Sequence, residues 1–227
     1  ETVQLLDASD ATIPVVLEER ALADVSEIVI VGSELDDVLT VDYAYGGDFG
    51  GLTVTFDAGG GGDDSLRLVG DGAGSASFRA DPAGSGAGVV EFGSDRIDFS
   101  VSGLDVVEIT AVDHLLLSTE GGADNLEISS PESGKSQVSG TSAGVAIADL
   151  VFSDVANVTV DTGDGEDNIA IREHGLGASG LETVSLSTGA GEDLLNVESA
   201  DLGIDPSGAV TFDGGGDRDA IAGPSAG

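Results

Sequence analysis

The amino-acid sequence predicts an all-β protein, folded as a right-handed parallel β-helix (β-solenoid) with coils of about 26 residues. Short runs of Val, Ile and Leu alternate with polar residues, which is the period of half-buried strands. A segment with this alternation and a Gly/Asp turn recurs at constant spacing, because Asp167, Asp193 and Asp219 are each 26 residues apart. One coil cannot bury its apolar face alone, so the repeats are expected to stack and form the core.

The clearest repeat units are residues 158–171, 184–197 and 210–222. In the first unit, Val158 and Val160 precede the turn and Ile169 and Ile171 follow it, and all four are expected to point inward. Weaker copies surround residues 34–39, 59–68 and 119–128, and irregular spacing between them indicates middle coils that lack the turn motif. The strands expected there are 88–92, 96–101, 106–110 and 114–118.

The domain prediction is a single β-solenoid domain over residues 1–227, which we expect to be a fragment of a longer repeat array. Residues 28–222 are assigned to the coils and residues 1–27 to a possible N-terminal cap. Within that cap, residues 14–25 are read as either a short amphipathic helix or a first strand.

The chain is strongly acidic, with 43 Asp and Glu against 7 Lys and Arg and a net charge of −36. Nucleic acid and anionic membrane surfaces would repel such a chain, and no apolar run is long enough for membrane insertion. A cationic partner fits better, and Ca²⁺ is the usual one for clustered aspartates. Adaptation to a saline habitat is the alternative source of the acidity.

The turns match the nonapeptide G-G-x-G-x-D-x-U-x, in which U is a large apolar residue, once per unit. Residues 59–67 match fully, and the later units each lack one or two positions. Glycines can turn backbone carbonyls toward one point, an aspartate adds a carboxylate, and a hard cation takes about six to eight such oxygens. The candidate metal ligands are Gly59, Gly60, Gly62, Asp64, Asp124, Asp161, Gly163, Gly165, Asp167, Gly189, Gly191, Asp193, Asp213, Asp217 and Asp219.

Stacking strengthens the case for a cation. Asp167, Asp193 and Asp219 should share one corner, about 5 Å apart, where each pair of charges repels by roughly 1–3 kcal/mol. Bound Ca²⁺ would reverse the sign of this interaction. The alternative is that the turns are plain Asp-Gly β-turns without a metal.

These turns resemble those of the haemolysin-type calcium-binding repeat (RTX) family, and the 26-residue pattern resembles solenoid arrays in large secreted bacterial surface proteins. The resemblance implies Ca²⁺ held between successive turns, secretion, and folding triggered by external calcium. The chain departs from the family in having the nonapeptide once per coil instead of back to back, which favours isolated ion sites.

The predicted function is an extracellular, secreted or cell-surface, calcium-binding structural or adhesive module of a bacterial surface protein, and not an enzyme. Its expected partners are calcium ions and other copies of itself or further repeats of the same polypeptide. The alternatives are a filament subunit that assembles end to end and a carbohydrate-active enzyme on a β-helix. The two histidines, His114 and His174, are expected at the surface, and a G-x-S-x-G match around Ser142 has no helix after it.

Overall fold

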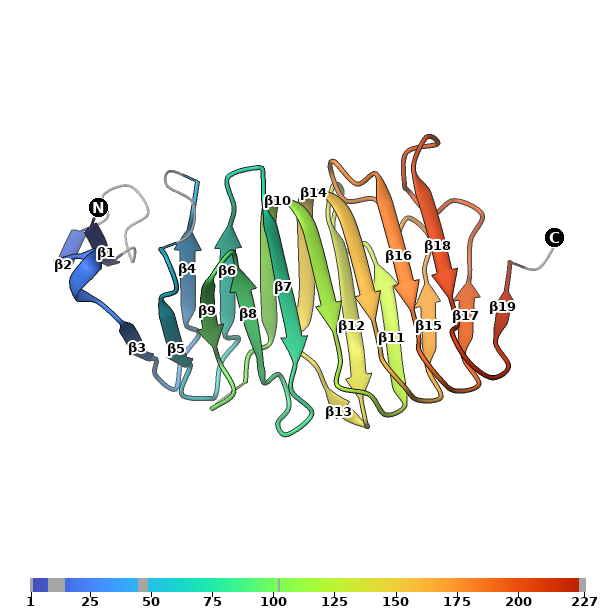
Figure 1. Cartoon of the computed structure of the whole chain (residues 1–227), viewed down its shortest axis with the longest axis horizontal. Coiled ribbons are helices and arrows are strands. Elements are labelled where there is room, and N and C mark those ends of the chain that lie inside the picture. The colour runs from blue at the N-terminus through green and yellow to red at the C-terminus, as the bar shows by residue number, and fades with distance from the viewer. Residues whose placement is uncertain (1, 8–14, 45–48, 102, 225–227) are drawn as a thin grey trace.

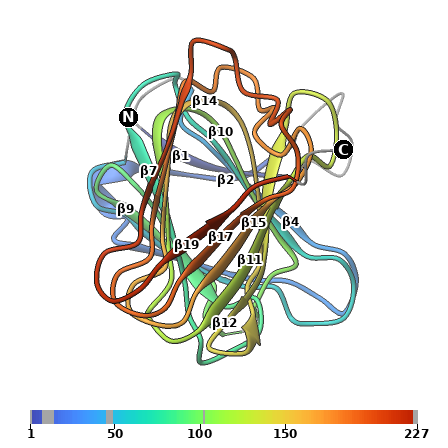
Figure 2. The same cartoon turned by 90° about the vertical axis from the view of Figure 1, so that its right-hand side faces the viewer.

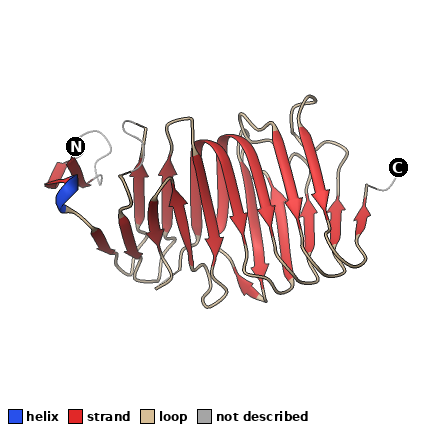
Figure 3. Ribbon diagram, viewed as in Figure 1, coloured by secondary structure: helices blue, strands red, loops and turns tan. Residues whose placement is uncertain are grey.

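We describe a computed structural model of the chain over residues 2–7, 15–44, 49–101 and 103–224. These residues form an all-β structure whose strands follow one another along the longest axis of the molecule (Figures 1 and 3). The only helical element among them is the 3-10 turn η1 (Leu22–Asp24). The predicted all-β class is therefore confirmed, and no helix of the described residues is long and apolar enough to cross a membrane.

The N-terminal segment is an antiparallel hairpin of β1 (Thr2–Asp7) and β2 (Val15–Ala21), which forms its own two-stranded sheet. The segment predicted as a helix or a first strand thus contains a strand and then η1, while residues 8–14 lie outside the described residues.

All other strands belong to one sheet of 17 strands that is mostly parallel and does not close on itself. The parallel strands form rows in which each strand pairs with the next coil. On the N-terminal side, one row consists of β3 (Glu27–Val31), β5 (Thr53–Asp57) and β9 (Asp95–Asp98). A second row consists of β4 (Val38–Asp42), β6 (Ser65–Val69) and the first half of β10 (Val106–Ser118). On the C-terminal side, one row consists of β7 (Ser75–Ala80), the second halves of β10 and β14 (Asp149–Asp161), β16 (Thr183–Ser187) and β18 (Ala209–Asp213). The other row consists of β11 (Asp124–Ser129), β15 (Asn168–Ile171), β17 (Leu194–Val197) and β19 (Ala220–Ala222).

The predicted 26-residue register is visible in the C-terminal pairings. Asn157 pairs with Thr183, and Thr183 pairs with Ala209, so the chain returns to the same row after each period. Viewed from the C-terminal end, β19, β17, β15 and β11 lie one behind another (Figure 2). The parallel stacking of the repeats is therefore confirmed by the register.

Antiparallel strands interrupt the stack in its middle. β8 (Gly88–Phe92) pairs antiparallel with both β7 and β9, while β12 (Ser136–Ser142) runs antiparallel to β11, β14 and the short β13 (Val145–Ala146). These insertions lengthen the middle coils, which explains the irregular spacing in the sequence. Strands were predicted at 88–92 and 96–101, and β8 and β9 are found there, although β8 runs against the predicted parallel direction.

The predicted strands 106–110 and 114–118 are one strand, β10, that turns a corner at Ala111. Ala111 has a φ of 57°, and Asp154 has a φ of 53° at the equivalent place in β14. Positive φ is uncommon outside glycine, so the bend would not be expected from these residue types. The bend lets one strand contribute to two rows, with β6 and β7 as separate partners.

The core lies between the rows and follows the predicted alternation. Val158 and Val160 are 2% and 1% exposed, and Ile169 and Ile171 are fully buried. Burying a side chain of this size stabilises a fold by about 1.5–3 kcal/mol. In β15 and β16 the alternate residues are more exposed, whereas β8 has three consecutive buried residues. The stacked apolar positions form one continuous core from Val41 to Leu195.

Candidate functional site

The motif aspartates lie at the corners where a strand of one row passes into the next, and they form two columns. The first aspartate column contains Asp37, Asp64 and Asp105. The backbone N–H of Asp37 donates to Oδ1 of Asp64 over 2.9 Å, and the N–H of Asp64 donates to Oδ2 of Asp105 over 2.8 Å. The carboxylates of Asp64 and Asp105 therefore each accept a hydrogen bond from the coil that precedes them.

The second aspartate column contains Asp124, Asp167, Asp193 and Asp219, at a different corner. The N–H of each residue donates to Oδ1 of the next, over 2.8, 2.9 and 3.3 Å in turn. Asp124, Asp167 and Asp193 are each 2% exposed. The predicted shared corner of Asp167, Asp193 and Asp219 is confirmed, whereas Asp64 belongs to the other column.

A threonine five residues before the aspartate binds the other carboxylate oxygen in the second column. Thr162 Oγ1 donates to Asp167 Oδ2 over 2.5 Å, and Thr119 Oγ1 donates to Asp124 Oδ2. Both threonines are buried, and Thr162 is fully so. A carboxylate with one N–H and one O–H donor is solvated by the protein in place of water, which offsets the cost of burying its charge.

The same column contains buried oxygens without a hydrogen-bond partner. They are Asp193 Oδ2 and Thr188 Oγ1 in one coil, and Asp124 Oδ1 and Ser142 Oγ near the other end. Asp124 and Ser142 face each other across the antiparallel pair of β11 and β12. Buried polar atoms without partners are uncommon and call for a water, an ion or a rotated hydroxyl group. Ser142 lies in a β-hairpin, so the strand-to-helix turn of a nucleophile elbow is not formed there.

The motif glycines bring the turns of successive coils into backbone contact. A Cβ atom on Gly191, whose φ is 152°, would lie 1.5 Å from the carbonyl oxygen of Gly165. The N–H of Gly165 donates in turn to the carbonyl of Ala190 over 2.8 Å. Glycine at these positions is therefore required by coil-on-coil stacking, whether or not a cation is bound.

Charge accumulates along the second column and affects ionisation. Burial raises the pKa of the Asp167 carboxyl, and the neighbouring carboxylates of Asp124 and Asp193 raise it further, against the lowering effect of its hydrogen bonds. Burial and the charge of Asp105 likewise raise the pKa of Asp149. The folded chain therefore holds ionised aspartates at a free-energy cost that a proton or a cation would reduce.

The predicted metal ligands divide between the corners of the two columns and the exposed edge of the turns, and among them Asp64, Asp124, Asp167 and Asp193 are buried. Gly59, Gly60, Gly62 and Asp64 belong to the corner of the first column, and Asp124, Gly163, Gly165, Asp167, Gly189, Gly191, Asp193 and Asp219 to that of the second. Asp161, Asp213 and Asp217 are exposed at the edge of the turns. Asp161 and Asp213 each accept an N–H from the glycine two residues on, Gly163 and Gly215. Within the described ranges, no group of three or more His, Cys, Asp or Glu side chains converges in a way that could hold a metal.

Sequence reasoning missed two members of the first column. Asp37 stands in the most degenerate copy of the motif, and Asp105 has no glycine turn of the motif before it. Another acceptor, the buried Asp95, takes the backbone N–H groups of Phe49, Gly51 and Leu52 over 2.5–2.9 Å. The only signal for Asp105 is an aspartate directly before an alternating strand.

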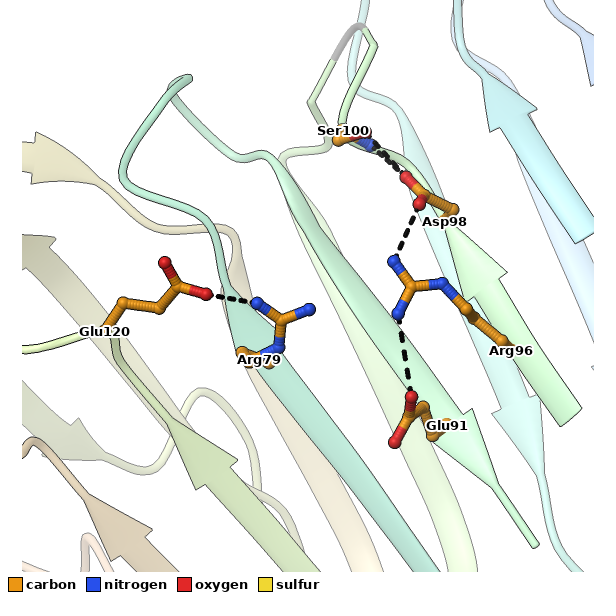
Figure 4. Close-up of polar contacts among 6 residues, drawn as sticks. All are labelled: Arg79, Glu91, Arg96, Asp98, Ser100 and Glu120. Atoms are coloured by element: carbon orange, nitrogen blue, oxygen red, sulfur yellow. Dashed lines mark hydrogen bonds and ion pairs between the residues drawn. The ribbon is translucent and has the colours of Figure 1, made fainter. Parts of the chain in front are cut away.

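Four basic side chains, those of Arg67, Arg79, Arg96 and Lys135, form ion pairs in the middle of the stack, and Figure 4 shows those of Arg79 and Arg96. Arg96 pairs with Asp98 over 2.9 Å and with Glu91 over 3.6 Å, and Arg79 of β7 reaches Glu120 from the next coil. Glu108 is more enclosed and pairs with both Arg67 and Lys135, over 2.7 and 2.9 Å.

Both histidines lie at the surface, as predicted. The side chain of His114 is 59% exposed beside Asp113, and that of His174 is 58% exposed beside Asp201. Each one faces a single carboxylate.

Comparisons with protein-family models, with curated proteins and with solved structures gave no significant match. The function is therefore argued from the two aspartate columns and their surroundings.

Proposed function

We propose that this chain is an extracellular structural module, a stiff rod of stacked coils of the right-handed parallel β-helix class with calcium as its counter-ion. The observation that carries the proposal is the pair of aspartate columns. In them, the buried carboxylates of Asp64, Asp167 and Asp193 accept backbone N–H groups of neighbouring coils. Residues used in this way tie one coil to the next.

The register supports the stiff-rod interpretation. Strands pair in parallel with the same row after a fixed period, and each row is continuous from coil to coil. Stacked strands stand about 4.8 Å apart, so every added period extends the rod by that amount. Such a module would act as a spacer or a display surface in a larger surface assembly, which is the structural or adhesive role.

Calcium is supported by charge and by the unpartnered oxygens. The column carboxylates of Asp64 and Asp167 already accept hydrogen bonds, so these two residues fit a structural role better than that of an open cation site. Asp124 and Asp193 each retain one buried oxygen without a hydrogen-bond partner. Oxygen donors of this kind are those that Ca²⁺ prefers, so these two residues are the proposed ligands.

The test is thermal unfolding by circular dichroism at low ionic strength, with EDTA and then with added Ca²⁺. We expect Ca²⁺ to raise the melting temperature more than NaCl of equal ionic strength does, because binding stabilises the folded state beyond charge screening. Equal effects of the two salts would reject calcium and would leave the structural role standing.

A variant locates the site. Asp193→Asn keeps a hydrogen-bond acceptor for its neighbour in the column but removes the charge, so the Ca²⁺-dependent rise should shrink. Asp71→Asn, a matched change at an exposed aspartate outside both columns, should leave the rise unchanged. If the two variants respond alike, Asp193 is not a ligand.

A further inference from the structure

Two antiparallel insertions interrupt the stack, and their strands are anchored in different ways. β8 buries three large apolar side chains against its neighbours. β12 buries only one, that of Val138, and its other two buried residues are Ser136 and Ser142. Each buried apolar side chain contributes about 1.5–3 kcal/mol, so β12 gains much less from apolar burial than β8 does. The position of β12 therefore depends more on polar contacts.

The two buried serines of β12 differ in their contacts. Oγ of Ser136, the first residue of the strand, accepts the backbone N–H of Ala178 over 3.0 Å, which ties β12 to a neighbouring coil. Ser142, the last residue of the strand, is 1% exposed, and its Oγ atom has no hydrogen-bond partner among the described residues. A buried hydroxyl group of this kind has lost its contact with bulk water, so it calls for a ligand.

The residue that faces Ser142 also has an oxygen without a partner. Ser142 lies directly opposite Asp124 of β11 in the antiparallel register, and residues paired in this way have Cβ atoms about 4.5–5.5 Å apart. Both residues are buried, so both side chains lie on the inner face of the pair. Oδ2 of Asp124 accepts the hydroxyl group of Thr119, whereas Oδ1 has no partner within the described ranges. One ligand between the two strands can satisfy both open oxygens, Asp124 Oδ1 and Ser142 Oγ.

The topology explains why Asp124 differs from the aspartates that follow it in the second column. Asp167 has the same kind of threonine partner, and its Oδ1 accepts the N–H of Asp124. Oδ1 of Asp193 accepts the N–H of Asp167 in the same way. Asp124 receives no such N–H, because the strand on its other side is β12, which runs antiparallel and places Ser142 there. The open oxygens therefore arise where the insertion meets the first regular coil.

Glycines bring the insertion close to the motif turn. A Cβ atom on Gly140 would lie 2.1 Å from the carbonyl oxygen of Asn125, so β12 and β11 are in close backbone contact near the end of β12. Gly122, whose φ is 104°, would place a Cβ atom 3.2 Å from that of Ala143, the residue after Ser142. The end of β12 thus lies against the first turn of the second column, and the open oxygens are enclosed between them.

Charge favours a cation over a water molecule at this place. Burial is the largest influence that raises the pKa of the Asp167 carboxyl, and the carboxylates of Asp124 and Asp193 raise it further. A cation beside Asp124 opposes this accumulation of negative charge, whereas a water molecule leaves it unchanged. Carboxylate and hydroxyl oxygens are also the hard ligands that Ca²⁺ prefers.

We propose that Ca²⁺ binds between Oδ1 of Asp124 and Oγ of Ser142 and fastens the β12–β13 hairpin to the first regular coil. This assignment rests on the proposed function, from which calcium and Asp124 are taken. It adds Ser142 as a ligand and makes the hairpin the element that calcium controls. Without the ion, Ser136 and Val138 still hold the start of β12, so opening is confined to residues 139–146.

Hydrogen exchange followed by mass spectrometry tests this link on the whole chain, in EDTA, in Ca²⁺ and in NaCl of the same ionic strength as the Ca²⁺ buffer. The reporter is the segment of residues 139–146, and the internal control is β8, the insertion that apolar packing anchors. Ser142→Ala removes the open hydroxyl group. Ser139→Ala is the matched control, because Ser139 lies in the same strand with its side chain on the opposite face. Circular dichroism checks that each variant is folded.

In the wild-type chain and in Ser139→Ala, Ca²⁺ at about ten times its Kd should slow exchange over residues 139–146 about tenfold beyond NaCl and leave β8 unchanged. Ser142→Ala should need about tenfold more Ca²⁺ for the same slowing, because one ligand is lost. In EDTA the three chains should exchange alike, since the hydroxyl group of Ser142 has no hydrogen bond to lose.

Equal slowing in Ser142→Ala and Ser139→Ala would remove Ser142 from the site and leave calcium elsewhere in the columns. Slowing of β8 by the same factor would indicate a general stabilisation and not a local link. Faster exchange of Ser142→Ala in EDTA, with no effect of Ca²⁺ on the hairpin, would identify a bound water only. Each of these results overturns the calcium link but not the proposed function. The proposed function fails, and the link with it, if Ca²⁺ and NaCl raise the melting temperature of the wild-type chain equally.

Discussion

Replacing Asp167 tests whether the column aspartates hold the coils together through hydrogen bonds. Asp167→Ala removes the acceptor of the Asp124 N–H and of the Thr162 hydroxyl, and the N–H is then buried without a partner. An unsatisfied buried group costs about 1–3 kcal/mol, so losing both bonds should cost roughly 2–4 kcal/mol. Thr162 can recover part of this through the carbonyl of Ser187, 3.5 Å away.

Asp167→Asn separates hydrogen bonding from charge. Both variants relieve repulsion from Asp124 and Asp193, which is worth roughly 1–3 kcal/mol per neighbour, so this contribution cancels between them. Asn keeps an acceptor for the Asp124 N–H. The free energy of unfolding of Asp167→Asn should therefore be about 2–4 kcal/mol higher than that of Asp167→Ala. We also expect Asn to be at least as stable as the wild-type chain in EDTA.

Urea unfolding in EDTA, followed by circular dichroism, measures these differences. Glu166→Ala is the control, because Glu166 is the exposed neighbour of Asp167 and its removal takes away one negative charge. It should change the free energy of unfolding by no more than about 0.5 kcal/mol. If the free energies of unfolding of Asp167→Ala and Asp167→Asn differ by no more than that margin, the hydrogen-bond argument is refuted.

Three further predictions concern pH, glycine and an ion-pair cluster. Because the pKa of Asp167 is raised above 3.8, the folded chain binds a proton before the unfolded chain does, so the melting temperature should rise as pH falls from 7 toward that range. Burial raises the pKa of Glu108, but its hydrogen bonds to Lys135 and Arg67 outweigh burial and lower the pKa below 4.5. The stabilisation that ionised Glu108 provides is therefore present above pH 4.5 and is lost at lower pH. A pH series of thermal melts should show this loss as a fall in melting temperature. Gly191→Ala should lower the melting temperature sharply, since its Cβ would overlap the Gly165 carbonyl. Lys135→Met should cost about 1 kcal/mol in urea unfolding, because Glu108 keeps one cation of two.

Each of these has a control or a contradicting outcome. A melting temperature that falls steadily from neutral pH would contradict the raised pKa of Asp167. Gly60→Ala should cost far less than Gly191→Ala, since no atom lies within 4 Å of its Cβ. Lys135→Met should have less effect in high salt if it acts through charge, and a salt-independent loss would point to packing instead.

Much of the stacking could be predicted from the sequence because it repeats. The separation of 26 residues fixes which strands pair, and the alternation fixes which side chains are buried, as Val158 and Ile169 show. The shared corner of Asp167, Asp193 and Asp219 follows from the same spacing.

The middle of the molecule could not be predicted in this way. The antiparallel strands β8 and β12 lie between coils, and nothing periodic marks them. They place the motif at one corner before the interruption and at another after it, so Asp64 and Asp167 belong to different columns. The bend at Ala111 uses a backbone conformation that alanine rarely adopts.

The physical role of the motif was also hidden at the sequence level. A glycine-rich turn followed by an aspartate is equally suited to holding a cation and to close backbone contact. Gly191 and Asp167 have partners in neighbouring coils. Their role can be recognised only when the residues above and below them in the stack are known. Spacing alone does not distinguish a ligand from a hydrogen-bond acceptor.

The constant register of the C-terminal coils makes their number adjustable. Ile171 pairs with Val197, so a chain that lacked residues 172–197 would rejoin equivalent positions and keep every strand in its row. Duplicating the same segment would lengthen the molecule by one step without disturbing its neighbours, as in other arrays with nearest-neighbour contacts. The coils that hold β8 and β12 lack this freedom, since their hairpins fit one place. Length can thus vary by recombination at one end of the molecule while the middle stays fixed.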